Sequence, residues 1–462
     1  MEELKTVHTN NPGKPVFPVL IPVTLISFVL FDTDLYYTVA AAIFFHQFIS
    51  FYFNLNERIP LRNLAGMMFT LNYLFGPALM FHWLNPFVED NYSMRGNAED
   101  YFTYAIPAML LFLAGLYIFA KKEEEEININ RIRAILDRYP WMPLQFIIAG
   151  VLASFSLPYI PSQLQFVVSS LAYLKFIGMF LSLLSTQRIN FLYLALSYGV
   201  LFLQSFSSSM FNDLLNMLFF LAIYLCIKYK PSGFLKIGGI VAGLVFLSFI
   251  QSIKFLLREQ ESNSIENLQK IPALVQKVQS KKLSTDEKVA NIIFRLSQGW
   301  VTSSSIEYKK NNGFEFQNGN HSLTILRLAL MPRIIDPDRM VVGDGTFFNL
   351  YSGHTIREGT SIALGILTDG FIDYGQNGIF IVFIFGLIIN GFIKFYNYLD
   401  DKYALAKVFL PVCFFYIRPD TDTFSSLGAA VKTTFVIAIV LFITYKFYLQ
   451  DKVSMNEQEV YE

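Results

Sequence analysis

The fold is decided by an apolar stretch at residues 378–397, which reads GIFIVFIFGLIINGFIKFYN. A helix of about 20 such residues is long enough to cross the hydrocarbon core of a membrane. Similar stretches recur from Phe17 to Leu449, and they stop for long only between Leu257 and Asn377. The sequence therefore predicts an all-α polytopic integral membrane protein with one large loop that contains short amphipathic helices.

We expect about twelve transmembrane helices on the basis of span length. The candidate spans are residues 17–31, 35–53, 65–84, 102–120, 141–157, 164–184, 190–206, 211–228, 236–256, 378–397, 406–417 and 428–448. The short segment Ser207–Met210 separates two of these spans, which form either a tight helical hairpin or one long broken helix.

The spans divide the chain into three segments. Residues 1–256 form an N-terminal bundle of about nine spans, and residues 378–462 hold the C-terminal spans and a tail. Residues 257–377 form the large loop, which contains the candidate active-site region.

Composition supports a membrane protein. Residues of the types AVILMFWYC make up 53% of the chain and charged residues only 16%, whereas a soluble protein carries about 25% charge. The formal net charge of zero argues against a nucleic acid as partner. Cys226 and Cys413 lie in apolar runs without a Cys or His neighbour at ligand spacing, so we expect no disulfide and no metal site.

The Lys and Arg residues of the short loops are distributed asymmetrically. Alternate short loops hold nearly all of them, and the other set holds only Arg95 and Arg418. Because positively charged short loops stay in the cytoplasm, both termini are expected there and the large loop on the opposite side. The connector Lys121–Arg138, an acidic run followed by basic residues, is interpreted as a solvated cytoplasmic face.

The large loop contains signals for folded helices. Ser284 and Glu287 form a capping box, and apolar residues then follow at helical spacing as far as Trp300. This amphipathic helix is expected either to pack on a core of the loop itself or to lie in the membrane interface.

Arginines and carboxylates concentrate in the second half of the loop. The guanidinium group binds phosphate through a rigid, permanently charged set of donors. Our candidates for binding a substrate diphosphate are Arg333, Arg327, Arg339, Arg357 and Arg418. For Arg327 an interfacial anchor is the alternative, and for Arg418 a structural pair with Asp420.

The candidate catalytic residues are Asp369, Asp373 and His354. The two aspartates are four residues apart in the stretch 359–375, so on a helix they share one face. A carboxylate or histidine there can act as a general base toward an acceptor hydroxyl. The sequence thus predicts glycosyl transfer from a lipid diphosphate as one chemistry that suits the loop.

Several motifs resemble those of the bacterial oligosaccharide repeat-unit polymerases (O-antigen, or Wzy-type, polymerases). They are Met331–Arg339, Asn349–Tyr351, Thr355 and Gly365–Gly378, followed by a glycine-containing span. Arg333 matches the proline-arginine position of that family. Asp369 stands where the family often has glutamate in a Gly-Glu-x-Tyr pattern, and Asp373-Tyr-Gly matches its Asn-Phe-Gly. The topology is similar over most of the chain, but the motifs cover only about 326–391.

The resemblance implies a multi-pass protein of the bacterial inner membrane. Its implied activity is a metal-independent membrane glycosyltransferase without a cofactor, which polymerises polyprenyl-diphosphate-linked oligosaccharide repeats into a surface polysaccharide. Its implied partners are the lipid-linked oligosaccharide, membrane lipid and a chain-length regulator as candidate protein partner, and no nucleic acid.

Two other functions remain open. A ligase that transfers a finished glycan to another lipid would use the same topology and chemistry. A transporter or flippase is disfavoured, because transporters commonly consist of repeated halves with a site at the membrane midplane. No such repeat is evident here, and the polar residues concentrate in one loop.

Overall fold

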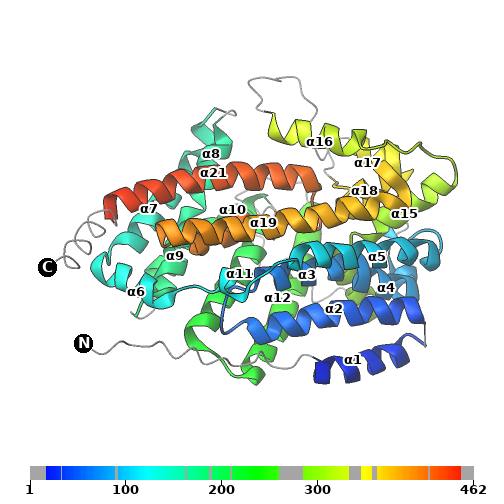
Figure 1. The fold of residues 1–462 in the computed structure, drawn as a ribbon, viewed down its shortest axis with the longest axis horizontal. Coiled ribbons are helices and arrows are strands. Elements are labelled where there is room, and N and C mark those ends of the chain that lie inside the picture. Colours follow the sequence, from blue (N-terminus) through cyan, green and yellow to red (C-terminus); the bar gives the residue numbers. More distant parts are fainter. Residues whose placement is uncertain are drawn as a thin grey trace.

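The computed structural model describes residues 17–32, 34–88, 92–161, 164–186, 190–208, 211–259, 285–331, 345–355, 362–414 and 417–448. Every regular element in these ranges is a helix, and α2, α5, α19 and α21 run alongside one another (Figure 1).

The helices have the following bounds: α1 Phe17–Leu30, α2 Leu35–Asn54, α3 Leu61–Thr70, η1 Leu71–Phe75, α4 Gly76–Leu79, η2 Met80–Leu84, η3 Asn85–Phe87, α5 Ala98–Tyr117, η5 Lys122–Glu125, α6 Ile129–Arg138, α7 Met142–Ser156, η6 Leu157–Tyr159, α8 Gln165–Ala172, α9 Leu174–Leu184, α10 Phe191–Ser208, α11 Asn212–Tyr229, α12 Gly233–Glu259, α14 Thr285–Ile293, η7 Phe294–Leu296, α15 Gly299–Lys310, α16 Asn320–Leu330, α17 Gly345–Ser352, α18 Ile366–Tyr374, η8 Gly375–Gly378, α19 Ile379–Tyr403, α20 Ala406–Phe414 and α21 Thr423–Tyr448. The helices α15 to α18 lie at one end of the bundle, termed the loop end, and α6 lies at the other, termed the strap end (Figure 1).

Seven helical stretches in the described ranges are long and apolar enough to cross a membrane. They are Leu61–Phe87, Ala98–Tyr117, Met142–Tyr159, Gln165–Leu184, Asn212–Tyr229, Ile366–Tyr403 and Ser426–Tyr448. Three shorter apolar helices accompany them, at Val19–Leu30, Phe191–Phe206 and Gly233–Phe246. The protein is therefore a helical membrane protein by length and composition, and the expected count of about twelve spans stays a prediction.

Three of the expected spans, 190–206, 211–228 and 406–417, are clarified by the structure. Helices α10 and α11 are separate and pack against each other, so the hairpin alternative is correct. The expected span at 406–417 is the nine-residue helix α20, which contains Pro411 and is buried along its whole length. At 1.5 Å per residue such a helix is about 14 Å long and does not cross a membrane.

Helices α5 and α19 cross with their backbones in close contact. A Cβ atom on Gly115 would lie 2.5 Å from the carbonyl oxygen of Phe383, and one on Gly386 would lie 2.3 Å from that of Phe112. Two glycines facing each other in this way let helix backbones approach closely, as is typical of membrane interfaces. This contact fixes α19, which follows α18 after the short 3₁₀ turn η8.

The stretch from α3 to η3 contains two π-helical turns, η1 and η2. Pro77 has no N–H, so the carbonyl of Tyr73 loses its helical donor. The hydroxyl of Tyr101 donates to that carbonyl at 2.8 Å. The carbonyl of Asn72 accepts instead from the backbone N–H of Gln298 at 3.1 Å. The irregular turns thereby fasten α5 and α15 to this stretch and place Tyr73 at the loop end.

The connector after α5 contacts α3, α19 and α20, and two of its glutamates, Glu124 and Glu125, are buried. Arg62 is 2% exposed, and its guanidinium contacts the carboxylate of Glu124 and donates to Asn390 Oδ1 at 2.8 Å. Its backbone N–H donates to Glu125 Oε1 at 2.7 Å. Lys407 donates to two connector carbonyls at 2.9 Å each. The expectation of a solvated face is thus wrong for Glu124 and Glu125, because a partner distant in sequence neutralises them.

The expected loop helix begins as predicted but ends early. Helix α14 covers Thr285–Ile293, a short 3₁₀ turn follows, and Trp300 belongs to the next helix, α15. Ser284 lies outside the described residues. Helix α14 packs against η2, at the end of an expected span. The hydrophobic core is one continuous cluster that includes residues of all three expected segments, such as Phe112, Val301 and Phe385. The three-segment division itself stays a prediction.

Candidate functional site

Helix α18 places the two predicted carboxylates inside the loop end. The predicted helix is present, and both Asp369 and Asp373 are 0% exposed. Each contacts the beginning of α16. The shared helix face was therefore a correct prediction, but the two side chains have different partners.

Asp373 anchors the first turn of α16. Its Oδ1 accepts hydrogen bonds from the backbone N–H groups of Gly319 at 3.0 Å and His321 at 3.1 Å. Its Oδ2 accepts from the N–H of Ser322 at 3.0 Å and from the Ser322 hydroxyl. The first N–H groups of a helix have no partner within the helix, and the helix dipole favours a carboxylate there. Because both oxygens are engaged, the geometry favours an anchoring role for Asp373 over proton transfer.

Asp373→Ala is expected to destabilise the protein by roughly 1–3 kcal/mol, because several buried donors lose their acceptor. Thermal unfolding of the purified protein measures the change. Ser322→Ala is the control, since it removes one of these donors and leaves the acceptor for the backbone N–H groups. Equal stability of Asp373→Ala and the unmodified protein would contradict the anchoring role.

Asp369 forms a buried pair with His321 on α16. The imidazole Nε2 lies 2.9 Å from Asp369 Oδ1, and both side chains are 0% exposed. Within the described part of the chain, His321 Nδ1 and Asp369 Oδ2 have no hydrogen-bond partner. The rings of Phe347 and Tyr351 on α17 pack on the imidazole, with centroids 5.5 and 5.2 Å away. Since buried polar atoms are normally satisfied, these two atoms are candidates for contact with a substrate.

The surrounding charges change the protonation of His321. Burial lowers the pKa of the imidazole, but the hydrogen bond to Asp369 and the charges of Asp369, Asp373 and Asp422 raise that pKa above its usual value overall. A raised folded-state pKa means that the pair stabilises the fold fully at a pH below the unfolded pKa. This contribution is lost as the pH rises through the folded-state pKa.

Two buried tyrosines border Asp369. Tyr73 and Tyr104 are 0% exposed and lie close enough to Asp369 for an electrostatic interaction. The Tyr73 hydroxyl donates to the carbonyl of Pro419 at 2.8 Å, and the Tyr104 hydroxyl donates to that of Leu367 at 2.8 Å. The tyrosines therefore fix the segment before α21 and the start of α18 around the pair.

Only two of the five arginines predicted to bind a diphosphate, Arg327 and Arg418, lie among the described residues. Arg333, Arg339 and Arg357 lie outside the described residues. Arg327 is exposed on α16, the helix that carries His321. Arg418 Nε lies 3.4 Å from Asp420 Oδ1, so the pairing considered for it is present.

His354 lies apart from the two carboxylates. Its Nε2 is 3.1 Å from the hydroxyl of Ser304, and its ring stacks on that of Phe348. Burial and the nearby charge of Arg95 lower its pKa, so the imidazole is neutral near neutral pH. These contacts join α15 and α17 and do not connect His354 with α18.

His321 was missed by sequence reasoning. It immediately precedes the apolar stretch that begins at Ser322, and nothing near it in sequence suggests a carboxylate partner. The one available signal is its position beside Gly319 and Asn320, a turn that begins an amphipathic helix. Its partner follows much later in the chain, so only the packed structure identifies the pair.

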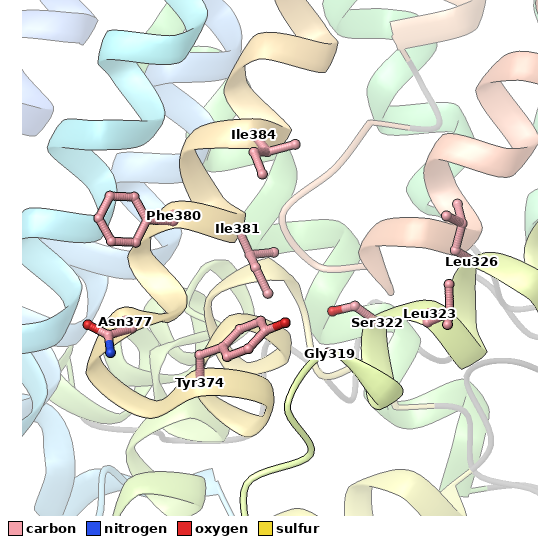
Figure 2. A pocket seen from close by; sticks show the side chains of 9 residues that line it. All are labelled: Gly319, Ser322, Leu323, Leu326, Tyr374, Asn377, Phe380, Ile381 and Ile384. Carbon is pink, nitrogen blue, oxygen red and sulfur yellow. The ribbon is translucent and has the colours of Figure 1, made fainter.

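An apolar groove opens beside this pair, between α16 and the first turns of α19 (Figure 2). Its volume is about 500 Å³, and it is lined by Gly319, Ser322, Leu323, Leu326, Tyr374, Asn377, Phe380, Ile381 and Ile384. Leucine and isoleucine side chains form its two walls, and the polar groups lie toward the end near Gly319 (Figure 2). At this end of the groove, the hydroxyl of Ser322 donates a hydrogen bond to Asp373.

No protein family, curated protein or solved structure is significantly similar to this chain. By length and composition the chain is a helical membrane protein, and its structure has a buried histidine–aspartate pair beside an apolar groove at one end of the bundle.

Proposed function

We propose that the protein transfers a glycan from a polyprenyl diphosphate to a hydroxyl of a second lipid-linked repeat, as a polymerase of surface polysaccharide. The observation that carries the proposal is the buried His321–Asp369 pair. The pair lies at the start of the arginine-bearing helix α16 and beside an apolar groove. A titratable pair in this position suits a substrate with a saccharide headgroup and a hydrocarbon tail.

In the proposed reaction, an acceptor hydroxyl oxygen attacks the anomeric carbon of the donor glycan. The bond between that carbon and the diphosphate oxygen breaks, and the diphosphate leaves with the electron pair. His321 takes the hydroxyl proton on Nδ1, while Asp369 holds Nε2 and stabilises the imidazolium that forms. Arg327, together with Arg333 and the other predicted arginines, stabilises the negative charge on the leaving diphosphate.

The proposed reaction requires α17 to move, because two aromatic side chains of this helix cover the imidazole of His321. Phe347 and Tyr351 of α17 pack against His321, so the acceptor reaches Nδ1 only when α17 moves away. Such an arrangement excludes water until the acceptor binds, which protects the donor from hydrolysis. The loop end would then face the non-cytoplasmic side of a bacterial inner membrane, as the loop charges predict.

Arg333→Ala is expected to abolish long glycan chains and to leave single lipid-linked repeats accumulating, because the leaving diphosphate loses a cationic partner. The lipid-linked glycans of a deletion strain that carries the variant are separated by size and compared with those of the complemented strain. Lys309→Ala, a cation on α15, is the matched control.

The size profile of lipid-linked glycans in the deletion strain also distinguishes a polymerase from a ligase and from a flippase. Complete but untransferred chains would indicate a ligase, and the absence of intermediates on the outer face would indicate a flippase. Either result would contradict the polymerase proposal. An unchanged chain-length distribution in Arg333→Ala would remove Arg333 from the mechanism.

A further inference from the structure

We propose that the groove between α16 and α19 binds the isoprenoid chain of the lipid-linked substrate, so that the donor reaches the His321–Asp369 pair directly from the bilayer. This inference rests on the proposed function for the identity of the lipid. It adds the place where the tail lies and the side from which the substrate approaches.

One wall of the groove belongs to a membrane-spanning stretch. Phe380, Ile381 and Ile384 lie in Ile366–Tyr403, which is among the seven stretches able to cross a membrane. Phe380 is 59% and Ile384 is 53% exposed. Exposed apolar side chains on a membrane-spanning helix face the hydrocarbon of the bilayer. On this reading, the groove is open to the acyl chains of the lipids.

The opposite wall is contributed by α16, which is too short to be a span. Leu323 and Leu326 face the α19 wall across the groove (Figure 2), and Leu323 is 64% exposed. Helix α16 also packs against α21. Helix α16 therefore supplies the second wall of a groove whose first wall belongs to a candidate span.

The polar end of the groove leads to the reacting groups. Ser322 lines the groove and hydrogen-bonds Asp373, and its neighbour His321 pairs with Asp369. Gly319 has a left-handed φ of +91°, and a Cβ atom there would lie 2.5 Å from the Tyr374 hydroxyl. Glycine at this position therefore lets α16 lie close to the end of α18. This close approach places the polar end of the groove next to the His321–Asp369 pair.

A cation and the size of the groove also bear on the assignment. Arg327 follows Leu326 and is one helical turn beyond Leu323, so it shares that side of α16. Arg327 is exposed, and a guanidinium group can bind a phosphate through two parallel hydrogen bonds. The volume of about 500 Å³ falls within the range of about 300–1,000 Å³ typical of small-ligand sites. The groove thus suits the proximal part of an isoprenoid chain.

Photo-crosslinking of the full chain in phosphatidylcholine vesicles tests this assignment. The probe is an isoprenyl diphosphate that carries a benzophenone in its hydrocarbon chain. We expect labelled peptides from both walls, 319–326 and 374–384. Unlabelled isoprenyl diphosphate should prevent the labelling, and an equal amount of phosphatidic acid should not. Equal competition by phosphatidic acid would overturn the assignment in favour of an ordinary phospholipid site.

Ile384→Trp provides the second measurement, because the larger side chain fills the groove from the α19 wall. Excluding only two methylene groups from an apolar site weakens binding by about tenfold, so labelling should fall by about that factor. Ile439→Trp is the matched control, since Ile439 is an isoleucine 45% exposed on α21. Leu323→Trp repeats the test from the α16 wall.

The outcomes separate the groove from the proposed reaction. Undiminished labelling in both groove-filling variants overturns the groove assignment, whatever happens to chain elongation. Groove labelling in a protein whose deletion leaves no single lipid-linked repeats supports an isoprenyl diphosphate site and rejects the polymerase function. Loss of labelling together with loss of elongation in Ile384→Trp supports both.

Discussion

His321→Gln is expected to slow glycan elongation by roughly 10²–10⁴-fold, the usual contribution of a positioned general base. Glutamine keeps a polar group near Asp369 but removes the nitrogen that accepts the proton. The rate is measured in vesicles that contain the purified protein and lipid-linked repeats. His46→Gln on α2 is the matched control for loss of an imidazole. An elongation rate in His321→Gln equal to that of the control would exclude His321 as the base.

Asp369→Asn tests the role of the pair through its pH dependence. Elongation requires unprotonated His321, so the rate should rise with pH through the raised pKa of this imidazole. Asparagine removes the hydrogen bond and charge that raise the pKa, whereas the burial that lowers it remains. The ascending part of the pH profile should therefore move to lower pH in Asp369→Asn, and the maximal rate should fall. A profile that moves to higher pH, or does not move, would contradict the proposed pairing.

Arg62→Met is expected to have the largest effect on stability. It leaves the buried carboxylates of Glu124 and Glu125 without their principal cation, and removing one partner of a buried ion pair costs roughly 3–5 kcal/mol. Thermal unfolding in detergent and the amount of protein in the membrane fraction measure the loss. Arg138→Met, an exposed arginine on α6, should change stability by no more than about 0.5 kcal/mol.

A triple variant separates the charge effect from lost packing. Adding Glu124→Gln and Glu125→Gln to Arg62→Met removes the uncompensated charges, so the triple variant should be more stable than Arg62→Met alone. Coupling of this kind is expected for residues in direct contact. A triple variant that is less stable than Arg62→Met would show that the carboxylates are stabilised independently of Arg62.

The class of protein was predictable because it depends on local properties of the chain. Apolar runs of membrane-spanning length and low charge content are visible without any knowledge of packing. The helix that carries Asp369 and Asp373 was also predictable, since two residues four positions apart share one helix face. The short helix α20 was misjudged, because a buried helix and a short span have the same composition.

The candidate site was predictable only in part. The sequence located its region and both carboxylates, but it assigned them similar roles and treated His354 as their companion. In the structure, Asp373 binds the first turn of α16, Asp369 binds His321, and His354 bonds Ser304. In each pair the two residues belong to segments far apart in the chain. The periodicity of apolar residues within one segment does not specify its contact with the other.

The sequence by itself determined a helical membrane protein, because helix formation and burial in lipid depend on residues that are neighbours in the chain. The tertiary structure decided which charges are paired. Arg62 neutralises the acidic connector, and His321 meets Asp369 beside the groove. A buried charge requires a partner within a few ångströms, and only the packing of distant helices places that partner.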